Sequence, residues 1–233
     1  MAIGASAGGL EAIEQFLGGV PDSSGLAFVI VQHLDPTHQG IMPELLQRGT
    51  RMPVAQVKDR TRAEPDHVYV IPPNSDLSIL RGVLHLVPPS TPRGLRLPID
   101  FFFRALADDQ RAASVAVILS GMGTDGTLGL KAVKERGGLV LVQEPTTAKF
   151  DSMPRSAIDT RLADVVAPVQ ELPARLIALR HGAPRPASVE ATPEPQAKSA
   201  LDKIVLVLRS RLGHDFSQYK KSTLERRVAR RMA

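Results

Sequence analysis

The 233-residue sequence contains no cysteine and no tryptophan, and aromatic residues make up only 4% of it. Without cysteine, the chain can form neither a disulfide nor a thiolate nucleophile. Because disulfides accompany oxidising compartments, their absence fits the cytoplasmic location that we expect. The scarcity of aromatic rings argues against nucleic-acid binding through base stacking.

Long apolar runs and an export signal are also missing. The longest apolar runs, such as residues 26–31, fall far short of the roughly 20 residues that a membrane-spanning helix needs. No basic segment followed by an apolar one opens the chain, so we expect neither a signal peptide nor membrane insertion. His, Cys and Asp do not cluster at metal-ligand spacings, and we expect no metal and no other cofactor.

Positive charge is concentrated at the C-terminal end. The chain has 29 Lys+Arg and 24 Asp+Glu residues, a net charge of +5. Residues 198–233 hold 10 of the basic and 3 of the acidic residues, which leaves 19 and 21 in the first 197. Since the basic charge is confined to the tail, we expect no nucleic-acid partner.

Four short apolar runs alternate with segments of helical apolar spacing. Unbroken runs rich in β-branched residues are typical of strands buried on both faces of a sheet. We therefore predict an α/β fold with a doubly wound, mostly parallel sheet flanked by helices. The predicted strands are residues 27–31, 68–71, 114–119 and 139–142, and the predicted helices are residues 9–17, 99–107 and 127–135.

Two further features of the chain differ from this alternation. Residues 76–80 and 83–86 are short apolar stretches around Arg81-Gly82, which predicts an antiparallel hairpin. Residues 181–200 contain four prolines and no periodic apolar pattern, which is typical of a linker. They separate a domain at residues 1–180 from residues 201–233, where apolar spacing predicts a short helical segment that begins a second module.

A serine lies in a run of small residues near the start of the chain. Residues 4–9 read GASAGG, and the first five match G-x-S-x-G with Ser6 at the centre. A nucleophile elbow needs small residues on both sides of its serine, because the backbone turns sharply and the next helix packs closely. An ordinary turn before a helix would show the same pattern, so these residues alone do not identify a nucleophile.

A histidine and an aspartate follow two of the predicted strands. His33 follows the strand at residues 27–31, and Asp125 lies in the glycine-rich loop after the strand at residues 114–119. Open α/β sheets place their ligand crevice at the carboxyl ends of the strands, so the fold would bring Ser6, His33 and Asp125 to one edge.

These are the groups that acyl transfer requires. The histidine takes the hydroxyl proton, and the carboxylate fixes the imidazole tautomer and stabilises its charged form. The chain order Ser, His, Asp differs from the Ser, Asp, His order of the α/β-hydrolases and argues against that fold. Structural alternatives remain, because His38 competes with His33 and Asp125 could cap the helix that follows it.

The sequence resembles the chemotaxis receptor protein-glutamate methylesterases of the CheB type. The resemblance covers residues 1–179 and implies an α/β catalytic domain. The implied reactions are hydrolysis of glutamate methyl esters and deamidation of glutamine on the cytoplasmic helices of methyl-accepting chemoreceptors, in two-component signalling. The motifs that carry the resemblance are IGASAGG at 3–9, VQH at 31–33, GMGTDG at 121–126 and MPRSAI at 153–158.

The resemblance also implies roles for individual residues. Ser6 becomes the nucleophile, His33 the general base and then acid, and Asp125 the orienting carboxylate. Ester attack creates an oxyanion that needs N–H donors, and the backbone amides of Ala7 and Met122 are our candidates. The family often has threonine where this chain has Ala7, yet the amide is unchanged, so we expect activity to be retained. Many members also carry a receiver domain ahead of the catalytic one, and we do not assume its control here.

The tail has a resemblance of its own. Residues 212–232 are similar to the beginning of the N-terminal helical region of chemotaxis receptor methyltransferases of the CheR type. That similarity implies recognition of the same receptors by a basic surface. The cofactor-binding domain of a methyltransferase would lie beyond residue 233, so we expect no S-adenosylmethionine binding. The alternative is a solvated basic helix.

Two other functions compete with ester hydrolysis. In a phosphate- or nucleotide-binding α/β domain, residues 4–9 would cradle phosphate at a helix N-terminus. The run lacks the G-x-G-x-x-G pattern, because Ser6 occupies the second glycine position. The other alternative is a non-enzymatic module that only binds receptors.

Overall fold

The computed structural model describes residues 1–32, 41–89, 96–182 and 230. Met1–Leu86 and Leu97–Ala183 form one compact unit, which contains the sheet that positions the candidate site. A second unit comprises Val87–Arg96 and Pro184–Ala233, of which residues 87–89, 96 and 230 are described. The predicted linker and helical tail therefore lie almost wholly outside the described residues.

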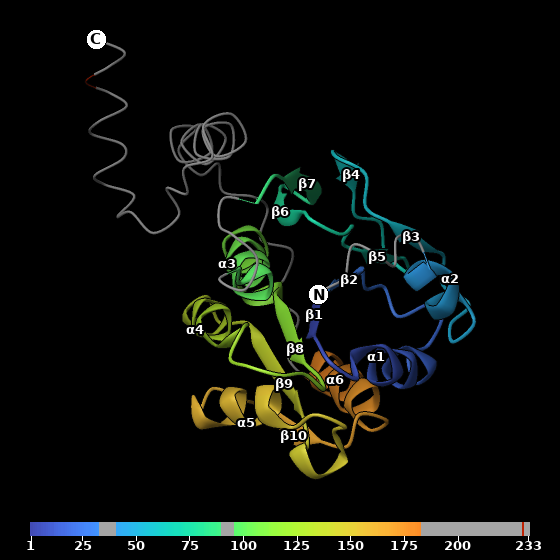
Figure 1. Cartoon of the computed structure of the whole chain (residues 1–233), viewed down its shortest axis with the longest axis vertical. Coiled ribbons are helices and arrows are strands. Elements are labelled where there is room, and N and C mark those ends of the chain that lie inside the picture. The colour runs from blue at the N-terminus through green and yellow to red at the C-terminus, as the bar shows by residue number, and fades with distance from the viewer. Residues whose placement is uncertain (33–40, 90–95, 183–229, 231–233) are drawn as a thin grey trace. The chain divides into compact units, whose positions relative to one another are not determined.

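A seven-stranded sheet forms the centre of the first unit (Figure 1). Its strand order is β10-β9-β8-β1-β2-β5-β3, and all neighbouring strands are parallel. This arrangement confirms the predicted parallel α/β fold. The strands are β1 (Ala2–Ala5), β2 (Phe28–Gln32), β3 (Val54–Gln56), β5 (Val68–Val70), β8 (Val115–Ile118), β9 (Leu139–Gln143) and β10 (Val165–Ala167).

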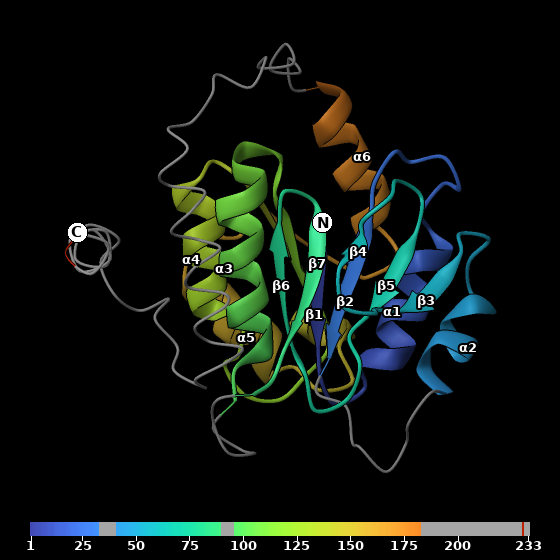
Figure 2. The same ribbon diagram turned by 90° about the horizontal axis from the view of Figure 1, so that it is seen from above.

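Helices cover both faces of this sheet (Figure 2). On one face, α1, α2 and α6 pack against strand residues such as Ile3 and Ala5. On the other, α3, α4 and α5 pack against the alternate positions, such as Ala2 and Val29. Burial on both faces explains the unbroken apolar composition of the central strands. The helices are α1 (Gly9–Gly18), α2 (Ile41–Gln47), α3 (Pro98–Gln110), α4 (Thr127–Glu135), α5 (Ser152–Asp159) and α6 (Leu172–Gly182).

A small second sheet has the order β4-β7-β6. It contains β4 (Thr61–Arg62), β6 (Asp76–Leu80) and β7 (Val83–Val87). β6 and β7 are joined by Arg81 and Gly82, which both have positive φ, 53° and 73°. Two positive φ angles in a row are the signature of the tight hairpin turn that matches strand twist, so the predicted hairpin is confirmed.

None of the helices in the described ranges combines the length and the apolar composition that a membrane span requires.

Candidate active site

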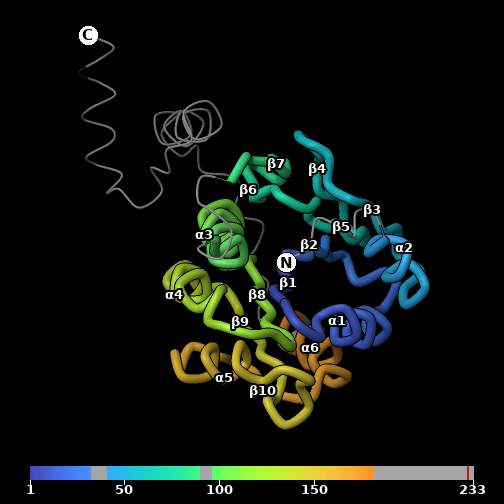
Figure 3. Tube along the Cα trace, in the orientation of Figure 1, coloured from blue at the N-terminus to red at the C-terminus, as the bar shows by residue number. Residues whose placement is uncertain are grey.

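The candidate site lies where the strand order of the sheet changes direction. The chain runs from β1 through α1 to β2 on one side, whereas β8 pairs with β1 on the other side (Figure 3). Loops that leave two such strands diverge to opposite faces of the sheet and leave a crevice between them. Ser6 follows β1 directly, and the GMGTDG loop at residues 121–126 lies in the connection between β8 and α4.

Ser6 forms the tight turn between β1 and α1. Its N–H donates to the carbonyl oxygen of Ser120, at 3.1 Å. Its own carbonyl oxygen accepts the N–H of Gly9 at 2.9 Å and the side-chain amide of Gln32 at 3.3 Å. The backbone of Ser6 is thus held on both sides, and its side chain is half-buried.

Glycines surround Ser6 at positions where a side chain does not fit. Gly8 has φ +68°, and a Cβ there would lie 2.9–3.0 Å from three side-chain atoms. A Cβ on Gly9 would lie 2.7 Å from the Cβ of Ala5. A Cβ on Gly121 would lie 3.1 Å from the Cβ of Ser6. The turn therefore has the close packing that a nucleophile elbow requires.

Ser120 fastens this turn to the loop after β9. It is 1% exposed, and its hydroxyl donates to the carbonyl oxygen of Ala7 and accepts the N–H of Phe150, both at 3.0 Å. Its own N–H donates to the side-chain oxygen of Gln143 at 2.9 Å. Sequence reasoning missed Ser120 and Gln32. The sequence feature that could have identified them is that each is the polar residue directly after an apolar run.

Asp125 is buried at the N-terminus of α3. Its carboxylate accepts the N–H groups of Ile99 at 3.0 Å and Asp100 at 2.9 Å. The alternative that Asp125 caps the helix after it is wrong. Gly126, with φ 102°, occupies the N-cap of α4, which has no side-chain cap bond, and the Asp125 side chain caps the preceding helix instead.

Asp100, in the first turn of α3, makes the reciprocal contact with the first turn of α4. Its carboxyl group, 2% exposed, accepts the N–H of Gly129 in α4 at 2.6 Å. Burial raises the pKa of Asp100 to about 6, and the nearby Asp125 adds to the effect. Asp125 and Asp100 together join the first turns of α3 and α4 through their backbone amides.

Both predicted oxyanion donors are next in the chain to Ser6 or to a residue that contacts it. Ala7 is its neighbour in the chain, and Met122 follows Gly121, which contacts Ser6. Gly121 is fixed by bonds of 3.0 Å from its N–H to the carbonyl oxygen of Phe150 and from the Met153 N–H to its own carbonyl oxygen. Within the described residues, neither Ala7 nor Met122 donates a backbone hydrogen bond.

The predicted base, His33, lies outside the described residues, and so does its alternative, His38. Gln32, the residue before His33, pairs with Ala5, the residue before Ser6. Ile99 connects the turn with the Asp125 loop, because its Cγ2 atom lies 2.5 Å from a Cβ placed on Gly4 and 3.1 Å from one placed on Gly126.

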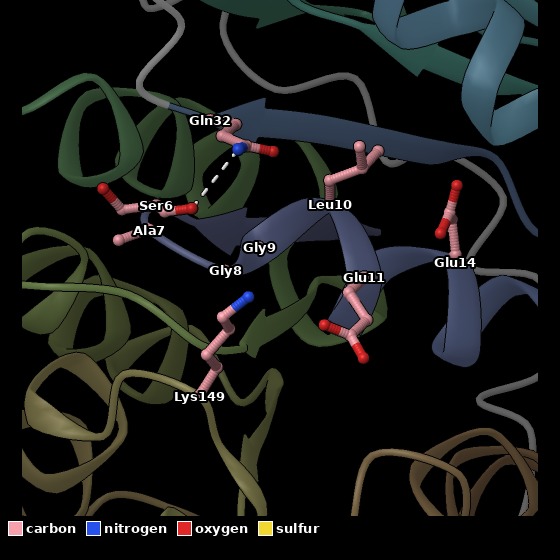
Figure 4. A pocket seen from close by; sticks show the side chains of 9 residues that line it. All are labelled: Ser6, Ala7, Gly8, Gly9, Leu10, Glu11, Glu14, Gln32 and Lys149. Atoms are coloured by element: carbon pink, nitrogen blue, oxygen red, sulfur yellow. Dashed lines mark hydrogen bonds between the residues drawn. The ribbon is translucent and has the colours of Figure 1, made fainter.

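A pocket of about 430 Å³ opens beside the turn (Figure 4). Glu11 and Glu14 on α1 and Lys149 from the loop after β9 give it charges of both signs. The carbonyl oxygen of Ser6 faces this pocket through its bond with Gln32, whereas the Ser6 hydroxyl points away from Gln32 (Figure 4). The lining residues are Ser6, Ala7, Gly8, Gly9, Leu10, Glu11, Glu14, Gln32 and Lys149.

Fold and site together define an α/β protein with a serine in a closely packed turn at the switch point of a parallel sheet. The family model for CheB methylesterase matches residues 1–176, and the model for the all-alpha domain of CheR methyltransferase matches residues 199–233. The chain belongs to the CheB methylesterase family, a family of carboxylic ester hydrolases.

Several relatives of this chain are named as protein-glutamate methylesterases. The chain is 34% identical to protein-glutamate methylesterase/protein-glutamine glutaminase 2 of Pseudomonas aeruginosa, over 76% of this chain and 52% of the relative. It is 36% identical to protein-glutamate methylesterase/protein-glutamine glutaminase 3 of Burkholderia orbicola, over 76% of this chain and 53% of the relative. The chain thus spans about half the length of these relatives.

A solved structure also matches the fold. The crystal structure of the Thermotoga maritima CheB methylesterase catalytic domain superposes with a TM-score of 0.70 at 30% sequence identity. The match covers 76% of this chain and 96% of that one, so the similarity spans nearly the whole Thermotoga domain.

Proposed function

We propose that this chain hydrolyses glutamate methyl esters on the cytoplasmic helices of chemoreceptors and deamidates receptor glutamine at the same site. The observation that carries the proposal is the Ser6 turn, in which a serine follows a parallel strand end and contacts Gly121, while the N–H groups of Ala7 and Met122 have no partners among the described residues. Family membership supports the same reaction. Because the substrates are cytoplasmic helices, we also propose a cytoplasmic location.

The reaction proceeds in two steps. His33 removes the proton of the Ser6 hydroxyl while Oγ attacks the ester carbonyl, and the N–H groups of Ala7 and Met122 stabilise the oxyanion. Collapse of the intermediate breaks the C–O bond to the methoxy group, which leaves as methanol with the proton from His33. Water then attacks the acyl-enzyme, releases the glutamate and restores Ser6. With glutamine as substrate, ammonia leaves in place of methanol.

Asp125 caps α3, and its proposed second role is to orient the His33 imidazole. The two backbone N–H groups of α3 fix the position of the carboxylate. Each carboxylate oxygen can accept more than one hydrogen bond, so a bond from the His33 imidazole is compatible with the cap.

The basic tail completes the proposed receptor contact. Residues 198–233 carry an excess of positive charge, and residues 199–233 match the all-alpha domain of CheR methyltransferase. We propose that this segment binds acidic surfaces of the same receptors. Such attraction between exposed charges acts mainly on the rate of encounter and weakens as salt concentration rises.

Methanol release from a methylated receptor fragment tests the proposed activity. The Ser6→Ala variant should lose turnover by a factor on the order of 10⁶, as in other serine hydrolases. Ser24→Ala is the matched control, because Ser24 precedes β2 at the opposite edge of the sheet and donates to Asp66. A Ser6→Ala variant that keeps most of the activity would overturn the nucleophile assignment.

A further inference from the structure

Gln32 reaches from the end of β2 to the turn that carries Ser6. Its side-chain nitrogen donates to the carbonyl oxygen of Ser6 at 3.3 Å (Figure 4). The same oxygen accepts the N–H of Gly9 at 2.9 Å. Two donors from different elements therefore fix the direction of one carbonyl group.

The orientation of the Gln32 amide follows from this contact. If the amide were turned over, its oxygen would face the carbonyl oxygen of Ser6, which is repulsive, so the nitrogen is assigned to this side. The side-chain oxygen Oε1 is then buried and has no hydrogen-bond partner among the described residues. A buried oxygen without a partner lowers stability, so an apolar side chain of similar size would serve the fold as well or better.

The contact has a consequence for Ala7. The carbonyl group of Ser6 and the N–H of Ala7 belong to one peptide unit, and the described residues contain no cis peptide bond. In a trans unit these two groups point in opposite directions. Holding the oxygen toward Gln32 therefore aims the Ala7 N–H away from the pocket, and the Ser6 hydroxyl also points away from Gln32 (Figure 4). A hydrogen bond to the oxygen also polarises the unit and strengthens its N–H as a donor.

We propose that Gln32 is a positioning residue of the oxyanion hole, which acts through the Ser6–Ala7 peptide to aim and strengthen the Ala7 N–H. The inference rests on the proposed function, since it presupposes ester attack by Ser6. A residue that acts only on the transition state should affect kcat and leave KM unchanged.

The test compares Gln32→Met with Gln47→Met. Methionine is unbranched and similar in length to glutamine, but it cannot donate a hydrogen bond. Gln47 is a structural control, because its side chain bonds the backbone of Thr50, Met52 and Val54. For each variant of the 233-residue chain, the measurements are kcat and KM for methanol release, the free energy of unfolding, and the rate of Ser6 phosphonylation by a fluorophosphonate. In that last reaction an O–P bond forms, fluoride leaves and the base takes the proton.

For Gln32→Met we expect kcat and the phosphonylation rate to fall about tenfold, less than the loss of a direct oxyanion donor causes. KM and stability should be unchanged, or stability slightly higher. Gln47→Met should lose stability and keep kcat.

Wild-type kcat and phosphonylation rate in Gln32→Met would overturn the inference, and so would a loss of activity that follows loss of stability. Failure of the proposed function itself looks different, because the wild type would then neither release methanol nor react with the fluorophosphonate.

Discussion

The close approach of Gly121 to Ser6 predicts the effect of a single added methyl group at Gly121. In Gly121→Ala the new Cβ would lie 3.0 Å from the Ser6 nitrogen and 3.1 Å from the Ser6 Cβ, and it would overlap the sulfur of Met153. The backbone of Gly121 is outside the left-handed region, so the cost comes from these contacts alone. The methionine side chain can move, whereas Ser6 is held by its backbone bond to Ser120.

We expect Gly121→Ala to lower the free energy of unfolding by about 1–3 kcal/mol, the usual cost of overpacking. Ser6 must shift by a few tenths of an ångström, and since a displacement of about 1 Å can cost roughly 10² in rate, kcat should fall about tenfold. Denaturant unfolding and methanol release measure the two effects. Gly18→Ala is the control, because a Cβ there meets its nearest atom at an ordinary 3.6 Å.

The double variant Gly121→Ala/Met153→Ala separates the two contacts. Truncation of Met153 opens space into which the new methyl group fits, so the loss of stability should be smaller than the sum of the single losses. Ser6 remains displaced, so kcat should stay low. Recovery of kcat in the double variant, or wild-type kcat in Gly121→Ala, would refute the argument that this methyl group acts through Ser6.

Two other buried groups give independent predictions. Ser120→Ala leaves the partners of its hydroxyl unpaired and should cost about 1–3 kcal/mol in denaturant unfolding, so unchanged stability would contradict the bonds to Ala7 and Phe150. Because the folded-state pKa of Asp100 is raised to about 6 from 3.8, the ionised form costs stability as pH rises between these values. Asp100→Asn should therefore be more stable than wild type by up to about 3 kcal/mol above pH 6, and the difference should vanish below about pH 4. A difference independent of pH would exclude this cause.

The sequence predicted four of the strands that are buried on both sides, did not include the short central strand β1, and missed the elements at the margins. The runs at β2, β5, β8 and β9 are apolar throughout because helices cover both of their faces. β3 and β10 end the sheet and contain only three residues each, with exposed positions among them. α5 buries only Met153, Pro154 and Ala157, too few for a clear helical pattern. Apolar periodicity records burial, so elements that bury little leave little signal.

The turn around Ser6 was predictable, but the side chains that hold it were not. Small residues next to a serine are a local signal, because the close contacts are made within the turn and with its nearest strands. The hydroxyl of Ser120, in contrast, bonds a residue 113 positions away in the sequence. Gln32, Ser120 and Gln143 share one property, since each follows or ends a buried strand and bonds the turn or loop beside it.

Asp125 shows how a catalytic proposal and a structural role can share one side chain. The sequence left two roles open, a cap for the next helix and an orienting carboxylate. In the structure the Asp125 carboxylate caps α3 and not the next helix. The Asp100 carboxyl group, in the first turn of α3, accepts a backbone N–H of α4. Because these bonds run in both directions, the position of the Asp125 loop relative to β1 depends on a helix that begins 27 residues earlier, at Pro98. Removal of the Asp125 carboxylate would therefore release the start of α3 as well as the imidazole that it is proposed to orient, so loss of activity in such a variant does not by itself identify a catalytic role.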